Sequence, residues 1–168
     1  MFRNVAMYQN KMFKKMVYSF ATLGGLGYFP YAPGTLTSGV AVLLFWMLKD
    51  TEVLWLSLAT IALFFFGVKA AQLVAIDQKK HDPSIVVIDE WVGMWLTLLI
   101  TKFYPNCFPK VAHSYLFLFL LFRFFDISKP FLIKRVEKVS GGWGIMIDDI
   151  IAAAYAIVFA LLGIGLCS

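Results

Sequence analysis

The sequence predicts an all-α protein, a compact membrane-embedded bundle of about five apolar helices preceded by an N-terminal amphipathic helix. Hydrophobic residues make up 61% of the 168 positions and charged residues 15%, whereas soluble proteins average about 25% charged residues. The mean hydropathy is +0.78. The apolar residues are gathered into long segments, separated by short polar or Gly- and Pro-rich ones. At this length a single domain is expected, over residues 1–168.

The charge distribution favours lipid over nucleic acid as a partner. The net charge is +5, but the basic residues flank apolar segments and do not form one stripe. We therefore expect contacts with anionic membrane lipids and no nucleic acid. Cys107 and Cys167 lie far apart in the sequence, so neither a disulfide nor a metal or redox motif is predicted.

Residues 1–22 are predicted to form the amphipathic helix. Its two faces are apolar (Phe13, Met16, Val17, Phe20) and largely basic (Lys11, Lys14, Lys15, Tyr18). Such a helix typically lies in the membrane interface with its lysines toward the phosphates. A peripheral helix packed on the bundle fits the pattern equally well.

Five apolar segments follow, at Gly39–Leu48, Val53–Ile76, Trp91–Tyr104, Tyr115–Phe122 and Ile150–Leu166. The second alone reaches the roughly 20 residues that cross a bilayer upright. The shorter segments can extend through their flanks, tilt, or stop part-way, so a bundle sunk into one leaflet is an alternative. A soluble bundle with a very apolar surface is another, although it would be prone to aggregate.

Five helices in succession place the connections on alternating faces. Gly24–Ser38, Asp77–Glu90 and Arg123–Asp149 then share one face, which carries twelve of the fifteen Lys and Arg residues and eight of the ten acids. Basic residues are enriched on the cytoplasmic side of membrane proteins. We therefore expect this face to be cytoplasmic, and the gathering of acids there to mark an active site.

Carboxylates at the ends of apolar segments suggest a metal site. Acidic side chains are costly there unless they are paired or bind a cation. An oxygen-rich, sulfur-poor set favours a hard cation, Mg²⁺ before Zn²⁺. Structural salt bridges between these acids and nearby bases are the alternative. The predicted metal ligands are Asp82, Asp89, Glu90, Asp126, Asp148 and Asp149.

The stretch Gly24–Ser38 has four glycines and two prolines, which argues against a regular helix there. It ends in Pro33-Gly34-Thr35, whose backbone N–H groups and hydroxyl can hold an anion at the start of the next helix. A plain structural loop is the simpler interpretation.

Several phosphatase mechanisms are excluded by motif. Neither cysteine is followed six positions later by an arginine, which argues against a cysteine–phosphate intermediate of the familiar loop type. The sequence contains no Asp-x-Asp pattern and no Gly-x-x-x-x-Gly-Lys-Ser/Thr phosphate loop.

Four sequence blocks carry a specific resemblance. The blocks are PYAPGTLTS, HDPSIVVIDEWVGMW, FRFFDISKP and GGWGIMIDDIIA, and they lie within Gly24–Ala153. In combination and order they resemble the phosphatidylglycerophosphatase A family. The resemblance implies a Mg²⁺-dependent, all-helical enzyme of the bacterial cytoplasmic (inner) membrane with its active site on the cytoplasmic face. Such an enzyme removes the phosphate monoester from phosphatidylglycerophosphate, leaving phosphatidylglycerol and inorganic phosphate.

The matched positions imply roles for individual residues. The expected catalytic residues are Asp89, Glu90, Asp126, Asp149 and His81, and the expected substrate-binding residues are Thr35, Ser38, Arg123 and Lys129. One or two Mg²⁺ ions would neutralise the phosphoryl oxygens and lower the pKa of a water. Either His81 or an unligated carboxylate would be the general acid or base, and a covalent phospho-aspartate stays open.

The chain also departs from the family pattern, at Thr37, Gly39, Leu132 and Ala153, without losing an ionisable group. Two other classes fit the sequence less well. A cation or proton transporter would carry acids in mid-helix or on both faces. A non-catalytic membrane-interaction subunit would use the polar face only to bind a partner. A homodimer is left open by the sequence.

Overall fold

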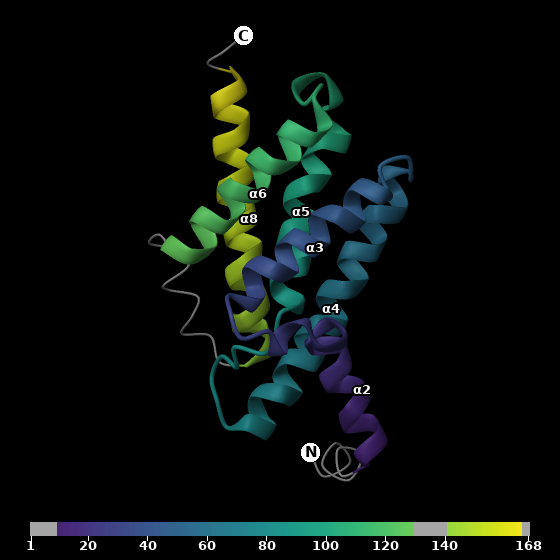
Figure 1. The fold of residues 1–168 in the computed structure, drawn as a ribbon, viewed down its shortest axis with the longest axis vertical. Helices are drawn as coiled ribbons and strands as arrows, with labels where there is room; N and C mark the ends of the chain where they lie inside the picture. Colours follow the sequence, from purple (N-terminus) through teal and green to yellow (C-terminus); the bar gives the residue numbers. More distant parts are fainter. Residues whose placement is uncertain (1–9, 130–140, 166–168) are drawn as a thin grey trace.

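The computed structural model describes residues 10–129 and 141–165, and every regular element in these ranges is a helix (Figure 1). This confirms the all-α prediction. The elements are α2 (Lys11–Ala21), the 3₁₀ helix η1 (Leu23–Tyr28), α3 (Pro33–Met47), α4 (Val53–Gln78), α5 (Ile88–Phe103), the 3₁₀ helix η2 (Pro105–Cys107), α6 (Val111–Ser128) and α8 (Gly142–Gly165).

Helices α5 and α8 run side by side through the bundle, and α4 packs against both. Helices α3 and α6 cross them obliquely (Figure 1). Phe45, Met94, Leu98 and Phe122, from α3, α5 and α6, are completely or almost completely buried in the core. The indole Nε1 of Trp95 donates a hydrogen bond of 3.1 Å to the carbonyl of Ala41, which ties α5 to α3.

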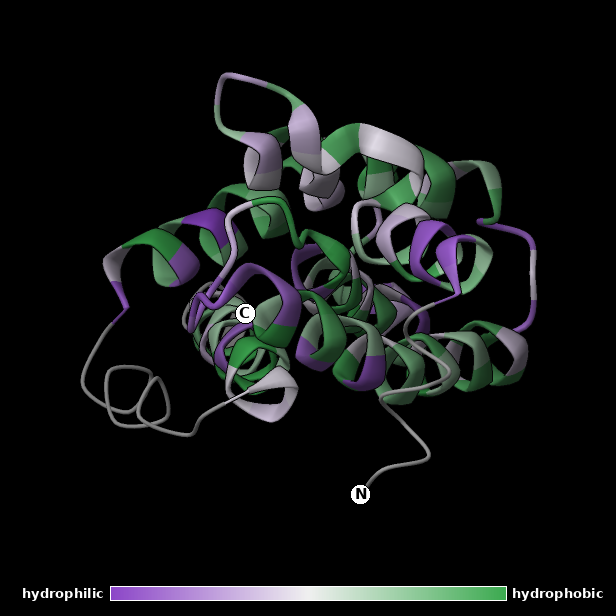
Figure 2. Ribbon diagram, turned by 90° about the horizontal axis from the view of Figure 1, so that it is seen from below, coloured by the Kyte–Doolittle hydropathy of each residue, from purple (hydrophilic) through white to green (hydrophobic). Residues whose placement is uncertain are grey.

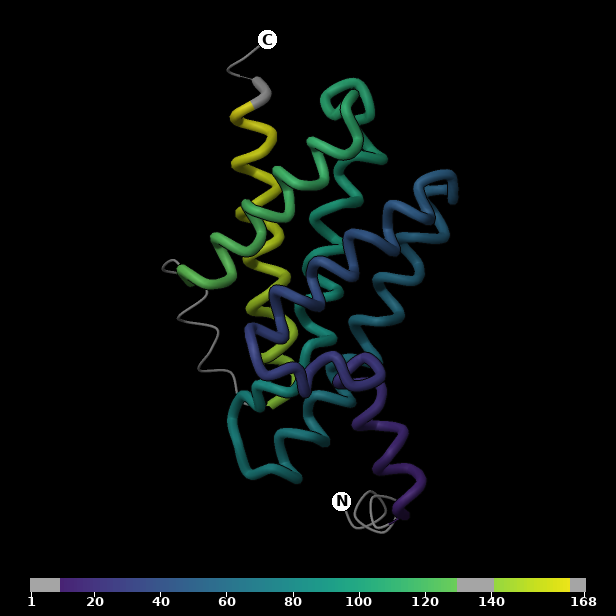
Figure 3. Tube along the Cα trace, viewed as in Figure 1, coloured from purple at the N-terminus to yellow at the C-terminus, as the bar shows by residue number. Residues whose placement is uncertain are grey.

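The two ends of the bundle differ in what they carry (Figure 3). One end collects α2, η1, the start of α3, the end of α4 and the starts of α5 and α8. The α3–α4 and α5–α6 connections lie at the other end. This arrangement follows the predicted alternation. Viewed from the first end, hydrophilic segments are interspersed among the apolar helices (Figure 2).

Helix boundaries differ from the predicted apolar segments. Helix α3 begins at Pro33, so the predicted irregular stretch is a 3₁₀ turn followed by the first turn of a helix. Proline suits this position because the first N–H of a helix has no intrahelical partner. Helix α8 begins at Gly142, eight residues before the predicted Ile150.

The early start of α8 has a tertiary cause. The N–H of Gly142 donates a hydrogen bond of 2.7 Å to Oε1 of Gln72, a side chain of α4. Gly141 precedes it with a φ of +85°, a conformation open to glycine. The helix is therefore capped from a different helix, which local sequence patterns do not reveal.

Within the described residues, three helices are long and apolar enough to cross a membrane: α4, α6, and residues Gly142–Gly163 of α8. Val53–Ile76 was the one apolar segment expected to reach spanning length by itself, and α6 and α8 follow the alternative in which shorter segments extend through their flanks. Helices α6 and α8 gain length because they extend through polar residues at their ends, including Arg123, Asp126 and Asp149. Large apolar side chains are exposed along all three helices.

The predicted amphipathic helix is present as α2, which packs against α4; residues 1–9 of the predicted range lie outside the described ones. Val17 and Ala21 are buried, whereas Met12 and Met16 are exposed. Lys14 forms an ion pair of 2.7 Å with Asp77 near the end of α4. The alternative of a peripheral helix on the bundle thus describes α2 well.

Candidate active site

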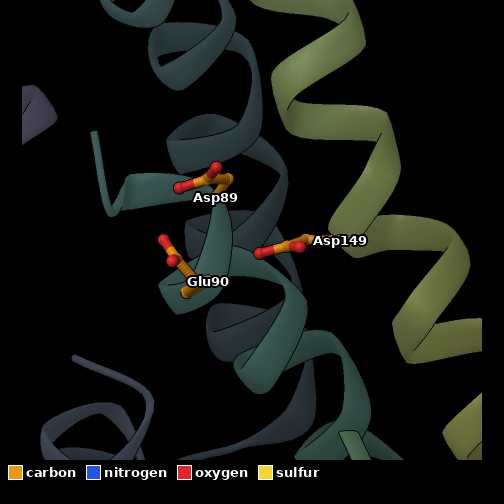
Figure 4. Close-up of side chains that lie close together, drawn as sticks. All are labelled: Asp89, Glu90 and Asp149. Carbon is orange, nitrogen blue, oxygen red and sulfur yellow. The ribbon is translucent and has the colours of Figure 1, made fainter. Parts of the chain in front are cut away.

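Three carboxylates meet where α5 begins beside α8. Asp89 and Glu90 lie in the first turn of α5, and Asp149 lies on α8. Figure 4 shows Asp149 pointing across to the other two side chains. Each residue contributes an oxygen to a group whose members lie within 4.8 Å of one another. We call these three residues the carboxylate triad.

Two glycines permit this close approach. A Cβ atom on Gly93, one turn after Asp89, would lie 2.8 Å from the ring of Phe122 and 3.0 Å from Cβ of Asp149. A Cβ on Gly34 would collide with Oε1 of Glu90. Helices α5 and α8 and the start of α3 can therefore come this close together around the triad only because these positions carry no side chain.

The carboxylate triad is largely buried and has few hydrogen-bond partners in the described ranges. Asp89 is 9% exposed and Asp149 is 4% exposed. Among the described residues, Oδ1 of Asp89, Oε2 of Glu90 and Oδ2 of Asp149 are buried without a hydrogen-bond partner. Burial and the charge of Glu90 raise the pKa of Asp89 well above its usual value. Burial also raises the pKa of Glu90. Such a group is costly to keep ionised without a cation.

The nearby bases pair with two other acids. Nη1 of Arg123 lies 2.6 Å from Oδ2 of Asp126, and Nζ of Lys129 lies 3.4 Å from Oδ2 of Asp148. Nε of Arg123 has no hydrogen-bond partner in the described part of the chain. The salt-bridge interpretation therefore applies to Asp126 and Asp148. Within the described ranges, no ion pair joins the triad to a Lys or Arg side chain.

A cavity of about 330 Å³ brings these groups together. Its lining includes the predicted residues Asp82, Asp89, Glu90, Arg123, Asp126, Lys129, Asp148 and Asp149. The start of α3 also borders it, through Ala32, Pro33 and Gly34. No side chain caps α3, and Ala32 has a φ of 47°. The N-terminus of a helix favours anions because of its unpaired N–H groups.

Three predicted residues lie elsewhere. His81 lines a neighbouring cavity of about 280 Å³, which shares Asp82 and Asp148 with the main one. Thr35 and Ser38 do not line the main cavity. Ser38 is buried and donates a hydrogen bond of 2.9 Å to the carbonyl of Gly34 within α3.

Sequence reasoning missed the site roles of Gly93 and Gln72. Gly93 had a weak local signal, since a glycine inside a helical pattern often marks close packing. Gln72 also had a weak local signal, because it is a polar residue within an apolar segment.

The fold and the site define a class: a helical membrane protein with a polar cavity that combines acidic groups, two bases and a helix N-terminus. Hard cations and phosphate groups are the ligands that such a set suits. The comparisons with known proteins narrow this class.

A family model described as phosphatidylglycerophosphatase A matches residues 19–164. A protein of Bacteroides thetaiotaomicron, provisionally named a phosphatidylinositol-3-phosphatase, is 37% identical over 80% of this chain and 84% of its own. The phosphatidylglycerophosphatase A of Haemophilus influenzae is 36% identical over 80% of each chain. That of Escherichia coli is 38% identical over 76% of this chain and 72% of its own. No solved structure matches the chain significantly.

The chain belongs to the phosphatidylglycerophosphatase A family. The resemblance inferred from the four blocks is thereby confirmed. This chain is a membrane protein and a lipid phosphatase, and lipid phosphatases of this kind are phosphoric monoester hydrolases.

Proposed function

We propose that this chain is a Mg²⁺-dependent phosphatase that hydrolyses phosphatidylglycerophosphate to phosphatidylglycerol and inorganic phosphate. The observation that carries the proposal is the carboxylate triad, with three buried oxygens that lack partners among the described residues. The named relatives from Haemophilus influenzae and Escherichia coli support the choice of lipid.

Asp89, Glu90 and Asp149 are the residues that would hold the ion. Their oxygens are clustered within 4.8 Å, and Mg²⁺ prefers carboxylate ligands. The donor set therefore fits the metal. A magnesium ion bound there would supply charge neutralisation at the phosphoryl oxygens and activation of a water molecule. Asp82, Asp126 and Asp148 line the same cavity and would act around this centre.

The phosphate monoester would be held by the basic groups and the start of α3. Arg123 offers its Nε, which has no hydrogen-bond partner in the described ranges. Lys129 lines the cavity beside Asp148. The first N–H groups of α3 border the same space. Together these donors would bind the phosphoryl oxygens and stabilise the charge that develops on them. Thr35 and Ser38 do not line the cavity, so this proposal assigns them no contact with the phosphate.

In the reaction, the oxygen of water bonds to phosphorus and the ester P–O bond breaks. The glycerol oxygen of the leaving lipid takes up a proton, and inorganic phosphate is released. We assign the proton transfers to a cavity carboxylate not engaged with the ion, in preference to His81, because His81 lines only the neighbouring cavity. The family and the charge distribution support placing the reaction at the cytoplasmic face of the inner membrane.

The test is phosphate release by purified protein from phosphatidylglycerophosphate, with Mg²⁺ and with a chelator. Phosphatidylinositol 3-phosphate is the comparison substrate, because one relative carries that name. We expect Mg²⁺-dependent release that prefers phosphatidylglycerophosphate. Asp89→Asn and Asp149→Asn should each lower activity at least about 100-fold, since even residues behind metal ligands contribute about 10–100-fold.

Asp50→Asn is the matched control, because Asp50 is exposed on the connection at the opposite end of the bundle. Melting measurements separate the metal site from a structural ion-pair network. Mg²⁺ should raise the melting temperature of the wild type but not that of Asp89→Asn. In the absence of metal, Asp89→Asn should melt no lower than the wild type, because the variant has lost a repulsive contact between like charges. Full activity in chelator, or an active but unstable Asp89→Asn, would overturn the metal site.

A further inference from the structure

Helix α6 carries an exposed apolar stripe along its outer face. Leu116, Leu120, Phe124 and Ile127 are 59%, 57%, 63% and 70% exposed. Their spacings of four, four and three residues place them on one face of a helix. Helix α6 is one of the three candidate membrane spans and lies obliquely on the outside of the bundle (Figure 1). The stripe therefore faces the hydrocarbon.

The stripe leads into the catalytic cavity. Arg123 and Asp126 alternate with it and turn inward, with side chains only 13% and 14% exposed. Ile127 belongs to both surfaces, because it is 70% exposed and also lines the cavity. A large apolar side chain at the mouth of a charged cavity has no role in binding a cation or a phosphate group.

Two exposed aromatic residues precede the start of α3, which lines the cavity. Phe29 and Tyr31 are 45% and 79% exposed, and their ring centroids lie 6.5 Å apart. They come directly before Ala32, Pro33 and Gly34, which line the cavity. Exposed aromatic rings of this kind are typical of the membrane interface. Ile127 therefore borders the cavity directly, and two exposed aromatic residues lie close in sequence to Ala32, Pro33 and Gly34 in its lining.

The size of the cavity separates headgroup from acyl chains. A volume of about 330 Å³ is at the small end of ligand pockets, which hold about 300–1,000 Å³. It suits a phosphorylated headgroup but not two acyl chains. The stripe from Leu116 to Ile127 covers twelve residues, and its first and last members are about 16 Å apart along the helix. One leaflet of the hydrocarbon core is about 15 Å thick, so the stripe matches the reach of a chain in the bilayer.

We propose that the lipid substrate enters sideways from the bilayer, between the end of α6 and Phe29–Tyr31, with its acyl chains left on the α6 stripe. The proposal rests on the proposed function and adds how the site selects a diacyl phosphomonoester. The chains stay in hydrocarbon while the headgroup moves into the cavity. Ile127 continues the apolar surface of α6 up to the cavity, so the chains can stay in apolar surroundings while the headgroup is bound.

The test compares two substrates with the same phosphomonoester: diacyl phosphatidylglycerophosphate in mixed micelles, and its water-soluble deacylated form. Ile127→Gln should lower the ratio of kcat/KM for the diacyl substrate to kcat/KM for the soluble one at least about tenfold. Ile127→Leu, which keeps the apolar contact, should restore the wild-type ratio. Tyr31→Ser, before the start of α3, should also lower the ratio, and its high exposure makes it safe for folding.

The matched control is Ile76→Gln. Ile76 is 62% exposed and lies two residues before the end of α4, at the same end of the bundle, but it does not line the cavity. Its ratio should equal that of the wild type. An equal loss of kcat/KM for both substrates in Ile127→Gln, or the same change of the ratio in Ile76→Gln, would overturn the proposed entry route. A wild type that hydrolyses neither substrate would instead overturn the proposed function beneath it.

Discussion

At the scale of single residues, the acids of the cavity divide into two groups with different surroundings. Asp126 and Asp148 each lie beside a base, Arg123 or Lys129. In the described ranges, the triad forms no ion pair with a Lys or Arg side chain and has three buried oxygens without hydrogen-bond partners. A paired acid can serve structure or orient a base, whereas an unpaired cluster needs a cation.

The two bases should respond differently to truncation. Arg123→Ala strands the largely buried Asp126, so we expect lower activity and a loss of up to about 3 kcal/mol of stability. Lys129 is the left-handed C-cap of α6, with a φ of 41° and a side chain 28% exposed. Lys129→Ala should lower activity but cost less than about 1 kcal/mol.

Melting curves and phosphate release on the purified variants check this pair. Lys110→Ala is the control, because Lys110 is an exposed lysine at the other end of α6. Full activity in Lys129→Ala would refute its contact with the substrate phosphate. Lys129 leaves the α-helical region, as a residue before a proline is expected to, and adopts the left-handed conformation.

At the scale of elements, the site depends on how closely α5 and α8 pack. Gly93 lets Phe122 and Asp149 approach α5. Gln72 on α4 caps Gly142 and so determines where α8 begins. Asp149 follows two turns later, and its position relative to Asp89 and Glu90 is therefore determined by contacts among three helices.

Gly93→Ala should separate α5 from α8. The added Cβ would lie 2.8 Å from Phe122 and 3.0 Å from Asp149, and overpacking of this kind typically costs about 1–3 kcal/mol. We expect a lower melting temperature and, in the folded protein, weaker stabilisation by Mg²⁺ and lower activity.

Gly39→Ala is the matched control. Gly39 lies inside α3, and a Cβ there would meet nothing within 4 Å. This change should stabilise the protein by up to about 1 kcal/mol, because alanine is a better helix former than glycine. Wild-type Mg²⁺ stabilisation and activity in Gly93→Ala would show that the site does not need this close approach.

At the scale of the whole molecule, the acidic cavity lies near one end of the bundle and not on both. Of the connections predicted to share a face, Gly24–Ser38 and Asp77–Glu90 lie at one end together with the start of α8, and residues 130–140 of the third lie outside the described ones. This one-sided placement suits an enzyme working on a headgroup at the membrane surface better than a transporter, which would place acids near the middle of the bilayer.

The predicted orientation can be tested by cysteine labelling in right-side-out membrane vesicles, with Cys107 and Cys167 changed to serine. Ser140, in the predicted cytoplasmic stretch, lies outside the described residues, so we choose Lys80→Cys, exposed at the site end. An impermeant reagent should label it only after permeabilisation. Asp50→Cys, at the opposite end, should be labelled at once. The reverse pattern would place the site outside the cytoplasm.

The sequence by itself determined the helical membrane class, the family and most of the acidic and basic residues that line the cavity. These properties are local: apolar runs of helical length, charges at their ends, and short blocks such as FRFFDISKP can be read without knowing which helices touch. The alternating polar connections followed from the same pattern.

Only the tertiary structure decided which acids form the triad and which pair with bases. Asp89 and Asp149 are sixty residues apart in the chain, and Asp148 and Asp149 are neighbours with different partners. The start of α8 depended on Gln72, a side chain seventy residues away from the glycine it caps. Ser38 was expected to bind substrate, but its hydroxyl group donates a hydrogen bond to the carbonyl of Gly34 within α3. Such outcomes depend on the distances between helices, and those are determined by packing at residues such as Gly93 and Gly34.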